Sequence, residues 1–275
     1  MLRTEALRDP GTEDSFRSML DALFLTPEQQ QNYETFLVSK SLQAPDAGRI
    51  VEGATIHPSL FDFQRSLVQW SIRKGRAAIF AGTGLGKTRM QLEFARLCGG
   101  KRSLIVCPLS VAQQTITEGE NIGIGVTWCS RPIASDGIWI SKYQKLSHFV
   151  GIQYDAIILD ESSILKSIDG ATRALLIEQF THIPLRLCCT ATPAPNDITE
   201  LANHAEFLGI MKRQEMLSRF FVHDSSLSAN VGGWRLKGHA RGAFWKWLTT
   251  WAAYVRQPSD LNYDAGLFVL PPLNV

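Results

Sequence analysis

The sequence predicts an α/β domain in which a mainly parallel sheet carries helices on both faces. Short apolar runs, each bounded by turn-forming or polar residues, predict buried strands. Stretches with helical spacing of apolar residues separate these runs, and such alternation is typical of parallel sheets. A glycine-rich turn follows the first run and leads directly into a helix. The runs cover 77–80, 103–107, 126–128, 138–140, 156–159 and 187–189.

Length and composition indicate a globular protein. A chain of 275 residues accommodates one large domain or one domain with an appendage, and 45% hydrophobic content permits a sizeable core. No apolar run approaches the roughly 18 residues of a membrane span, and Met1–Asp14 lacks the apolar segment of a signal peptide. Five cysteines without C-x-x-C spacing favour reduced, buried thiols in a cytoplasmic protein. Because the net charge is only +2, a nucleic-acid partner requires a local basic surface.

We expect two parts, a helical N-terminal extension with a linker over residues 1–50 and the main domain over 51–275. Apolar spacing within 14–25 predicts a short amphipathic helix, and Thr26-Pro27 predicts the start of a second one. The extension either docks a partner or nucleic acid or, as we favour, packs on the main domain. Proline and glycine residues predict a linker at 43–56.

Residues 77–92 predict a phosphate-binding loop. An apolar strand runs into a glycine-rich turn, Lys87-Thr88 follows, and an amphipathic helix comes next. Glycines let the backbone wrap closely around phosphate, and the helix N-terminus adds partial positive charge. We expect Lys87 to reach the β- and γ-phosphates and the Thr88 hydroxyl to bind Mg²⁺. The usual first glycine of the motif is Ala81 here, and a chance glycine-rich turn is the alternative. The expected nucleotide-binding residues are Gln64, Gly82, Thr83, Gly84, Gly86, Lys87 and Thr88.

Gln64 belongs to this set although it precedes the loop. It lies at the start of a predicted helix that extends through about Arg73. Its amide offers a donor and an acceptor that match the N6 and N7 edge of adenine. A solvated glutamine at a helix start is the simpler alternative.

Two carboxylates end the apolar run 156–159. We expect Asp160 to hold Mg²⁺ directly or through water, and Glu161 to orient or deprotonate the attacking water. The alternative is a strand that simply enters a polar loop. It loses weight because parallel strands bring their carboxyl ends to one sheet edge. Thr190 and Thr192 follow the next buried run, where their hydroxyls are expected to sense the γ-phosphate through Glu161.

Six motifs occur in the order typical of superfamily-two helicases. The segments that resemble motifs Q, I, Ia, Ib, II and III are Gln64, AGTGLGKT at 81–88, CPLSVAQQ at 107–114, ISKYQ at 140–144, LDES at 159–162 and TATPAPN at 190–196. The residues of these motifs are most similar to those of Swi/Snf-like DNA translocases of phage and bacteria, and the resemblance covers residues 57–270. The resemblance implies a RecA-like, three-layer α/β/α first motor lobe. Motors of this family hydrolyse ATP, with Mg²⁺, at a cleft between two lobes and move along nucleic acid, with DNA favoured over RNA.

The same resemblance implies residue roles. By position, Lys87, Asp160 and Glu161 are implied to be catalytic, with Thr88 and Asp160 at the metal. Thr190 and Thr192 are implied to couple hydrolysis to movement. The implied nucleic-acid contacts are to the backbone, so base sequence would hardly be read. These contact residues are Pro108, Ser110, Ser141, Lys142 and Tyr143.

The second lobe of this family, with its arginine fingers, has no counterpart in the sequence. No Q-x-x-G-R-x-x-R pattern occurs. We therefore expect a second RecA-like lobe to act in cis or in trans. An arginine finger accelerates hydrolysis about 10³-fold or more. This chain alone is thus expected to bind ATP–Mg²⁺ and to turn it over slowly.

The segment 234–256 interleaves aromatic and basic residues without an acidic one. Such a surface suits nucleic acid, because bases stack on aromatic rings and phosphates pair with Lys or Arg. For the aromatic residues we favour a core-facing stripe on one helix. Lys237 and Arg241 are candidate phosphate contacts, and 224–233 is expected to be a mobile loop. The stripe residues are Phe244, Trp247 together with Leu248, Trp251 and Val255.

Two classes of function stay open. The first is a nucleic-acid-stimulated ATPase, either a translocase or a helicase. The second is a nucleotide-switched scaffold that binds a partner without separating strands. A metabolic kinase is disfavoured because the sequence carries no signature of an acceptor-substrate pocket. We expect a cytoplasmic protein of a bacterial or phage-infected cell, with no membrane partner.

Overall fold

The computed structural model describes residues 42–166, 170–224 and 233–268. The chain divides into two compact units, residues 1–43 and 44–275, and the description below concerns the second. The helices expected within residues 1–41 lie outside the described residues, as does nearly all of the loop expected at 224–233. Among the residues described, no helix combines the length and the apolar character that crossing a membrane requires.

A seven-stranded sheet forms the centre of this unit, and its neighbouring strands are all parallel. The order across the sheet is β3-β4-β2-β5-β6-β1-β9. Each apolar run that predicts a strand forms one, so the parallel α/β class is confirmed. The strands are β1 (Arg76–Ala81), β2 (Arg102–Cys107), β3 (Val126–Trp128), β4 (Gly137–Lys142), β5 (Ala156–Asp160), β6 (Leu185–Thr190) and β9 (Ala252–Val255).

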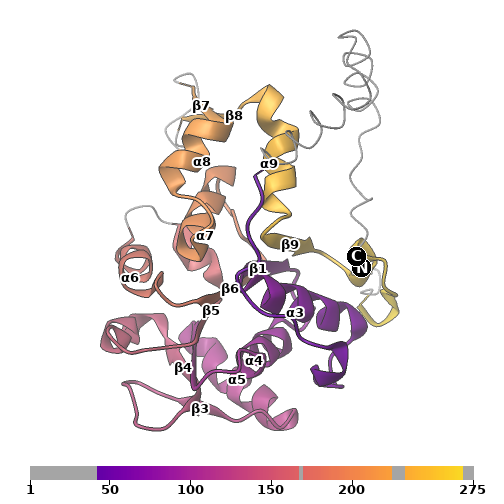
Figure 1. Ribbon diagram of the computed structural model, residues 1–275, viewed down its shortest axis with the longest axis vertical. Coiled ribbons are helices and arrows are strands. Elements are labelled where there is room, and N and C mark those ends of the chain that lie inside the picture. The colour runs from indigo at the N-terminus through magenta and orange to yellow at the C-terminus, as the bar shows by residue number, and fades with distance from the viewer. Residues whose placement is uncertain (1–41, 167–169, 225–232, 269–275) are drawn as a thin grey trace, which may run out of the picture. The chain divides into compact units, whose positions relative to one another are not determined.

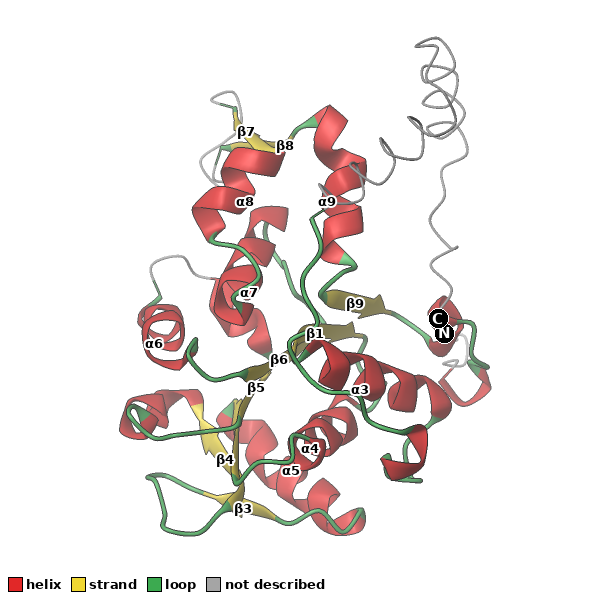
Figure 2. Ribbon diagram, in the orientation of Figure 1, coloured by secondary structure: helices red, strands yellow, loops and turns green. Residues whose placement is uncertain are grey.

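Helices cover both faces of the sheet (Figures 1 and 2). On one face, Phe63 and Phe94 pack in one apolar cluster with Ile79 of the sheet. On the other face, the Phe80 ring contacts His204 edge-on, because successive strand residues point to opposite sides. The first face carries α3 (Asp62–Lys74), α4 (Lys87–Leu97) and α5 (Leu109–Asn121), and the second carries α6 (Ala171–Phe180) and α7 (Leu201–Leu208).

A smaller group of elements lies between β6 and β9 in the chain. It consists of α8 (Arg213–Phe220), the antiparallel pair β7 (Phe221–His223) and β8 (Trp234–Leu236), and α9 (Arg241–Leu248). Aromatic rings hold it together: Phe220 stacks on Trp247 with ring centroids 5.4 Å apart. Figure 1 shows these elements together at the top of the view.

The prediction that one helix carries the stripe from Phe244 to Val255 is wrong. Helix α9 ends at Leu248, and Ala252–Val255 instead forms β9, paired with β1 at the sheet edge. Two threonines end the helix, since the hydroxyls of Thr249 and Thr250 donate to carbonyls of its last turn. The stripe residues are nevertheless all buried, as the core-facing reading requires.

The stretch expected to be a linker packs closely on the main unit. The N–H groups of Ala47, Gly48 and Arg49 donate to three carbonyls at the end of α3. A Cβ on Gly48 would lie 1.8 Å from the Ile72 carbonyl oxygen, so only glycine fits this crossing. These bonds satisfy carbonyls that a helix end leaves without partners. The five cysteines are all free and buried, as expected.

Candidate functional site

The glycine-rich turn connects the end of β1 to the start of α4. Gly84 and Gly86 adopt positive φ angles of 85° and 74°, a region that side chains disfavour. The N–H of Gly82 donates to the Val255 carbonyl at 2.9 Å, so β9 supports the first residue of the turn. Ala81 continues the strand opposite Val255. Position 81 therefore does not need a glycine, which accounts for this departure from the usual motif.

Lys87 is the first residue of α4. Its ammonium donates to the carbonyls of Ala81 and Gly82 at 3.0 and 3.2 Å, so the side chain folds back over the turn. Thr88 follows half-buried, whereas Thr83 and Gly84 are exposed. A lysine amine and the N-terminus of a helix, both at a glycine turn, form a setting that attracts an anion.

Gln64 lies beneath the turn and is 1% exposed. Its Nε2 donates to the Leu85 carbonyl at 2.9 Å, and its Oε1 accepts from the Phe61 N–H at 3.0 Å. A Cβ on Gly86 would lie 2.3 Å from this amide. The Nε2 end of the amide thus holds the turn against α3, and the Oε1 end caps the start of α3; sequence reasoning missed the contact with the turn. Adenine recognition by Gln64 stays a prediction.

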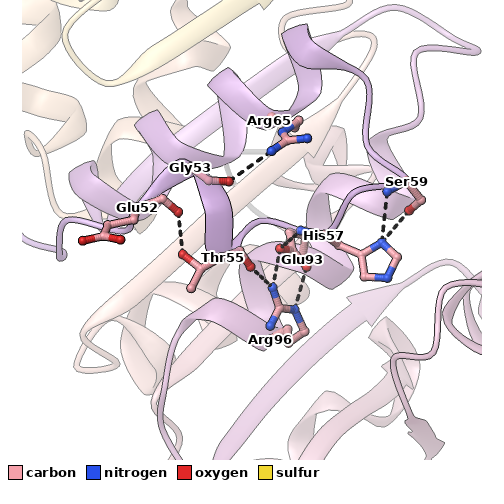
Figure 3. A network of polar contacts seen from close by, with 8 residues as sticks. All are labelled: Glu52, Gly53, Thr55, His57, Ser59, Arg65, Glu93 and Arg96. Atoms are coloured by element: carbon pink, nitrogen blue, oxygen red, sulfur yellow. Dashed lines mark hydrogen bonds and ion pairs between the residues drawn. The ribbon is translucent and has the colours of Figure 1, made fainter.

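A polar network fixes the segment that leads into α3 (Figure 3). The fully buried Glu93 carboxylate of α4 accepts from the His57 N–H and from Arg96 Nε, both at 2.8 Å. Arg96 also donates to the Thr55 carbonyl at 2.6 Å. The network anchors residues 55–57 on the helix that begins at the turn, and so places the start of α3 beside that turn.

The acid pair lies at the same sheet edge as the glycine turn. Asp160 ends β5 opposite Cys189 of β6, and Thr190 of β6 lies opposite Phe80 of β1. The turn and the acid pair are therefore two strand spacings apart, about 10 Å. Burial raises the pKa of the Asp160 carboxyl group, and the nearby charge of Lys87 acts weakly in the opposite direction.

Asp160 is 5% exposed, and this burial raises its pKa above the ordinary value. A hydrogen bond from Gln91 Nε2 to Asp160 Oδ1, 2.6 Å long, acts in the opposite direction. Gln91 Oε1 is buried without a partner among the described residues. Gln91 lies one turn after Lys87 on α4, a position that sequence reasoning did not single out.

Glu161 adopts a left-handed backbone conformation with φ 49°. Thr190 Oγ1 donates to Glu161 Oε2 at 3.1 Å, and the Thr192 N–H donates to Thr190 Oγ1 at 3.1 Å. The structure thus brings the Thr190 hydroxyl to the second carboxylate, and the Thr192 backbone to that hydroxyl. Their role in sensing phosphate stays a prediction.

A buried histidine from α7 reaches the loop after the acid pair. His204 Nε2 lies 3.1 Å from Ser162 Oγ. Burial lowers the pKa of His204 to about 4, so the ring is neutral at pH 7. No sequence signal pointed to this pair, because the two residues are 42 positions apart.

The candidate nucleic-acid residues fall into two groups. Pro108 and Ser110 follow β2, and Lys142 ends β4 opposite Cys107, so these residues share the carboxyl edge with the acid pair. Within this group Ser110 is exposed, Pro108 and Lys142 are half-buried, and Ser141 and Tyr143 are buried.

The other two candidates, Lys237 and Arg241, belong to the elements around α8 and α9. Lys237 Nζ donates to the carbonyls of Ser218 and Arg219 at 2.8 and 3.2 Å, which caps the end of α8. Arg241 is exposed at the start of α9. Their roles as phosphate contacts stay predictions.

The residues at the edge fit a triphosphate with Mg²⁺. The hydroxyl of Thr88 and the carboxylate of Asp160 are hard oxygen donors of the kind that Mg²⁺ prefers. Among the described residues, the buried Gln91 Oε1 has no hydrogen-bond partner, whereas Nε2 of the same amide donates to Asp160. A buried polar atom without a partner calls for an explanation, such as a catalytic role or a bound water or ion.

Comparison with known proteins shows the fold. No family model and no curated protein matches the sequence. Among solved structures, the chain is similar to the SWI2/SNF2 ATPase core of Sulfolobus solfataricus, in a complex with dsDNA, with a TM-score of 0.62 and 18% sequence identity. The match covers 76% of this chain and 46% of that one, so this chain spans less than half the length of the ATPase core. The likeness and the parallel sheet establish a RecA-like α/β fold.

Proposed function

We propose that this chain is the ATP-binding first lobe of a nucleic-acid translocase or helicase of the Swi/Snf-like group. One observation carries the proposal: the Lys87 turn and the Asp160–Glu161 pair lie two strands apart at one carboxyl edge of a RecA-like sheet. In open α/β sheets, ligands bind at this edge. The wording of the motifs favours a phage or bacterial member.

Each residue of the site has a chemical role in this proposal. Lys87 and the N–H groups of the glycine turn hold the phosphates, and Gln64 lies where it keeps the turn in shape. Thr88 and Asp160 hold Mg²⁺, which neutralises phosphate charge when it is bound. Glu161 orients the attacking water and accepts its proton. Thr190, bonded to Glu161, is placed to respond to changes around that carboxylate.

We further propose DNA as the nucleic acid and a second RecA-like lobe as the partner. The similar SWI2/SNF2 core is itself in complex with dsDNA, and this chain matches 46% of its length. Pro108, Ser110 and Lys142 share the edge with the acid pair, so backbone phosphates held there would lie beside the nucleotide. The remaining half of the neighbour's length supports a second lobe in cis or in trans.

Nucleotide binding is the first test. Titration with a fluorescent ATP analogue in Mg²⁺ should show binding by this chain alone. Lys87→Ala should weaken that binding about tenfold or more, since a hydrogen bond to a charged group contributes roughly 1.5–3 kcal/mol. Lys101→Ala, at an exposed site after α4, is the matched control and should bind normally. Failure of the unaltered chain to bind nucleotide in Mg²⁺ would refute the proposal.

Turnover is the second test. DNA should stimulate ATP hydrolysis, with the second lobe supplied where the chain alone is slow. Glu161→Gln should retain nucleotide binding and lose about 10²-fold or more of the rate, the usual contribution of a general base. Nucleotide binding without stimulation by any nucleic acid would instead support the switched scaffold.

A further inference from the structure

Tyr143 does not point outward at the sheet edge. Its side chain is 7% exposed, and its hydroxyl donates to the backbone carbonyl of Asp160 at 2.6 Å. The residue follows β4, whereas Asp160 ends β5, and β2 lies between these strands. The ring therefore reaches beneath the end of β2 to the acid pair. Burial raises the pKa of the Tyr143 hydroxyl well above its ordinary value, so the group remains a protonated donor.

The bonded carbonyl belongs to the peptide group that joins the two acidic residues. A peptide group is planar, so a bond to the Asp160 oxygen also fixes the orientation of the Glu161 N–H. Glu161 has φ 49°, a left-handed conformation that is uncommon outside glycine. A residue in such a conformation persists where its surroundings restrain it. Here Tyr143 holds the backbone from one side and Thr190 holds the carboxylate from the other.

Tyr143 is also joined directly to Lys142, the last residue of β4. Lys142 is half-buried at the carboxyl edge and lies opposite Cys107, next to Pro108. Among the described residues, no ion pair involves Lys142. A phosphate that engages this lysine would shift the backbone to which the tyrosine ring is attached.

We propose that Tyr143 is a positioning residue that ties the orientation of Glu161 to nucleic-acid contact at Lys142. The inference rests on the proposed function, and it assigns Tyr143 a role other than direct contact with nucleic acid. Engagement of Lys142 adjusts the Asp160–Glu161 peptide through the tyrosine hydroxyl, and Glu161 then orients its water. The link requires only a local movement at the end of β4, because the Tyr143 side chain reaches from there to the Asp160 carbonyl.

Tyr143→Phe tests the inference, because it removes one oxygen and retains the ring that fills the core. The maximal DNA-stimulated rate should fall about three- to tenfold, the range that loss of one hydrogen bond corresponds to. Nucleotide affinity and DNA affinity should each stay within about twofold, and the basal rate without DNA should fall by a smaller factor than the stimulated rate, so that the stimulation factor decreases. A merely structural tyrosine would alter the basal and the stimulated rate by the same factor.

Tyr154→Phe is the matched control. Tyr154 is equally buried and donates to the Phe149 carbonyl at 3.4 Å, away from the acid pair. Its removal should leave the stimulation factor unchanged. Lys142→Ala should raise the DNA concentration needed for half-maximal stimulation. This variant thus reports on DNA binding at the edge, whereas Tyr143→Phe reports on the effect of that binding on Glu161.

The outcomes distinguish the two proposals. If DNA stimulates the unaltered protein and the Tyr143→Phe variant by the same factor, the inference is overturned and the proposed function stands. An equal loss of basal and stimulated rates overturns it too. If the unaltered protein with its second lobe shows no stimulation, the proposed function fails and the inference fails with it.

Discussion

Lowering the pH from 7.5 to 5.0 should remove about 2 kcal/mol of folding free energy through one buried histidine, His204, whose pKa is lowered from 6.5 to about 4. Because its pKa is depressed in the folded state, the unfolded chain binds more protons between pH 6.5 and 4. Protonation therefore favours unfolding in this window, and the stability contributed by the neutral ring is present above pH 6.5. At pH 5.0 the unfolded histidine is almost fully charged and the folded one is almost fully neutral.

Urea denaturation followed by tryptophan fluorescence measures this effect at the two pH values. His204→Gln, which retains a group able to bond to Ser162, should lose about 2 kcal/mol less than the unaltered protein between pH 7.5 and 5.0. The comparison is needed because the raised pKa of Asp160 acts in the opposite direction. An acid with a raised folded pKa binds protons more readily when folded, and this contribution cancels between the two proteins.

An exposed histidine supplies the control. His182→Gln removes an imidazole at the surface and should leave the pH dependence of unfolding as it is in the unaltered protein. The reasoning would be refuted if His204→Gln and the unaltered protein lost the same stability on acidification. It would then follow that the imidazole is not held neutral by its surroundings.

Two further predictions concern the metal and the nucleic acid. Gln91→Met keeps the volume of the side chain and removes its bond to Asp160, so the Mg²⁺ concentration for half-maximal tightening of nucleotide binding should rise about tenfold. Nucleotide binding in EDTA should be the same for Gln91→Met and the unaltered protein. The exposed variant Gln113→Met is the control. An unaltered Mg²⁺ dependence in Gln91→Met would reject the role of Gln91 in holding Asp160 for the metal. Arg241→Glu should weaken DNA binding and reduce the slope of log affinity against log salt by about one, which binding assays at several salt concentrations measure. Lys237→Gln should mainly lower the melting temperature, because Lys237 caps α8. Equal DNA affinity of the unaltered protein, Arg241→Glu and Lys237→Gln would exclude a phosphate contact at Arg241.

Some features of the site follow from neighbouring residues and were therefore predictable. The strand before the glycine turn and the helix that begins at Lys87 form where their apolar spacing indicates. The acid pair lies at a strand end because the apolar run stops there. That the glycine turn and the acid pair share one edge was also predictable, because all strands of a parallel sheet end at the same edge.

Other features required the third dimension. The spacing from Phe244 to Val255 fits one helix, yet the open edge of β1 offers backbone partners that Ala252–Val255 satisfy as a strand. From its place after a strand, Tyr143 was expected to contact nucleic acid at the surface. The strand order instead places the carbonyl of Asp160 within reach of its hydroxyl. Periodicity reports which side of an element is buried and does not report which element covers it.

The sequence by itself determined where this protein turns and where its strands end, and it predicts which residues bind phosphate and metal. It did so because glycine conformation, apolar spacing and carboxylate chemistry are properties of a few adjacent residues. Only the tertiary structure decided that Gln64 supports the turn, that Gln91 and Tyr143 hold Asp160, and that His204 meets Ser162. Those contacts join residues 17 to 69 positions apart, and their partners depend on the order of strands in the sheet.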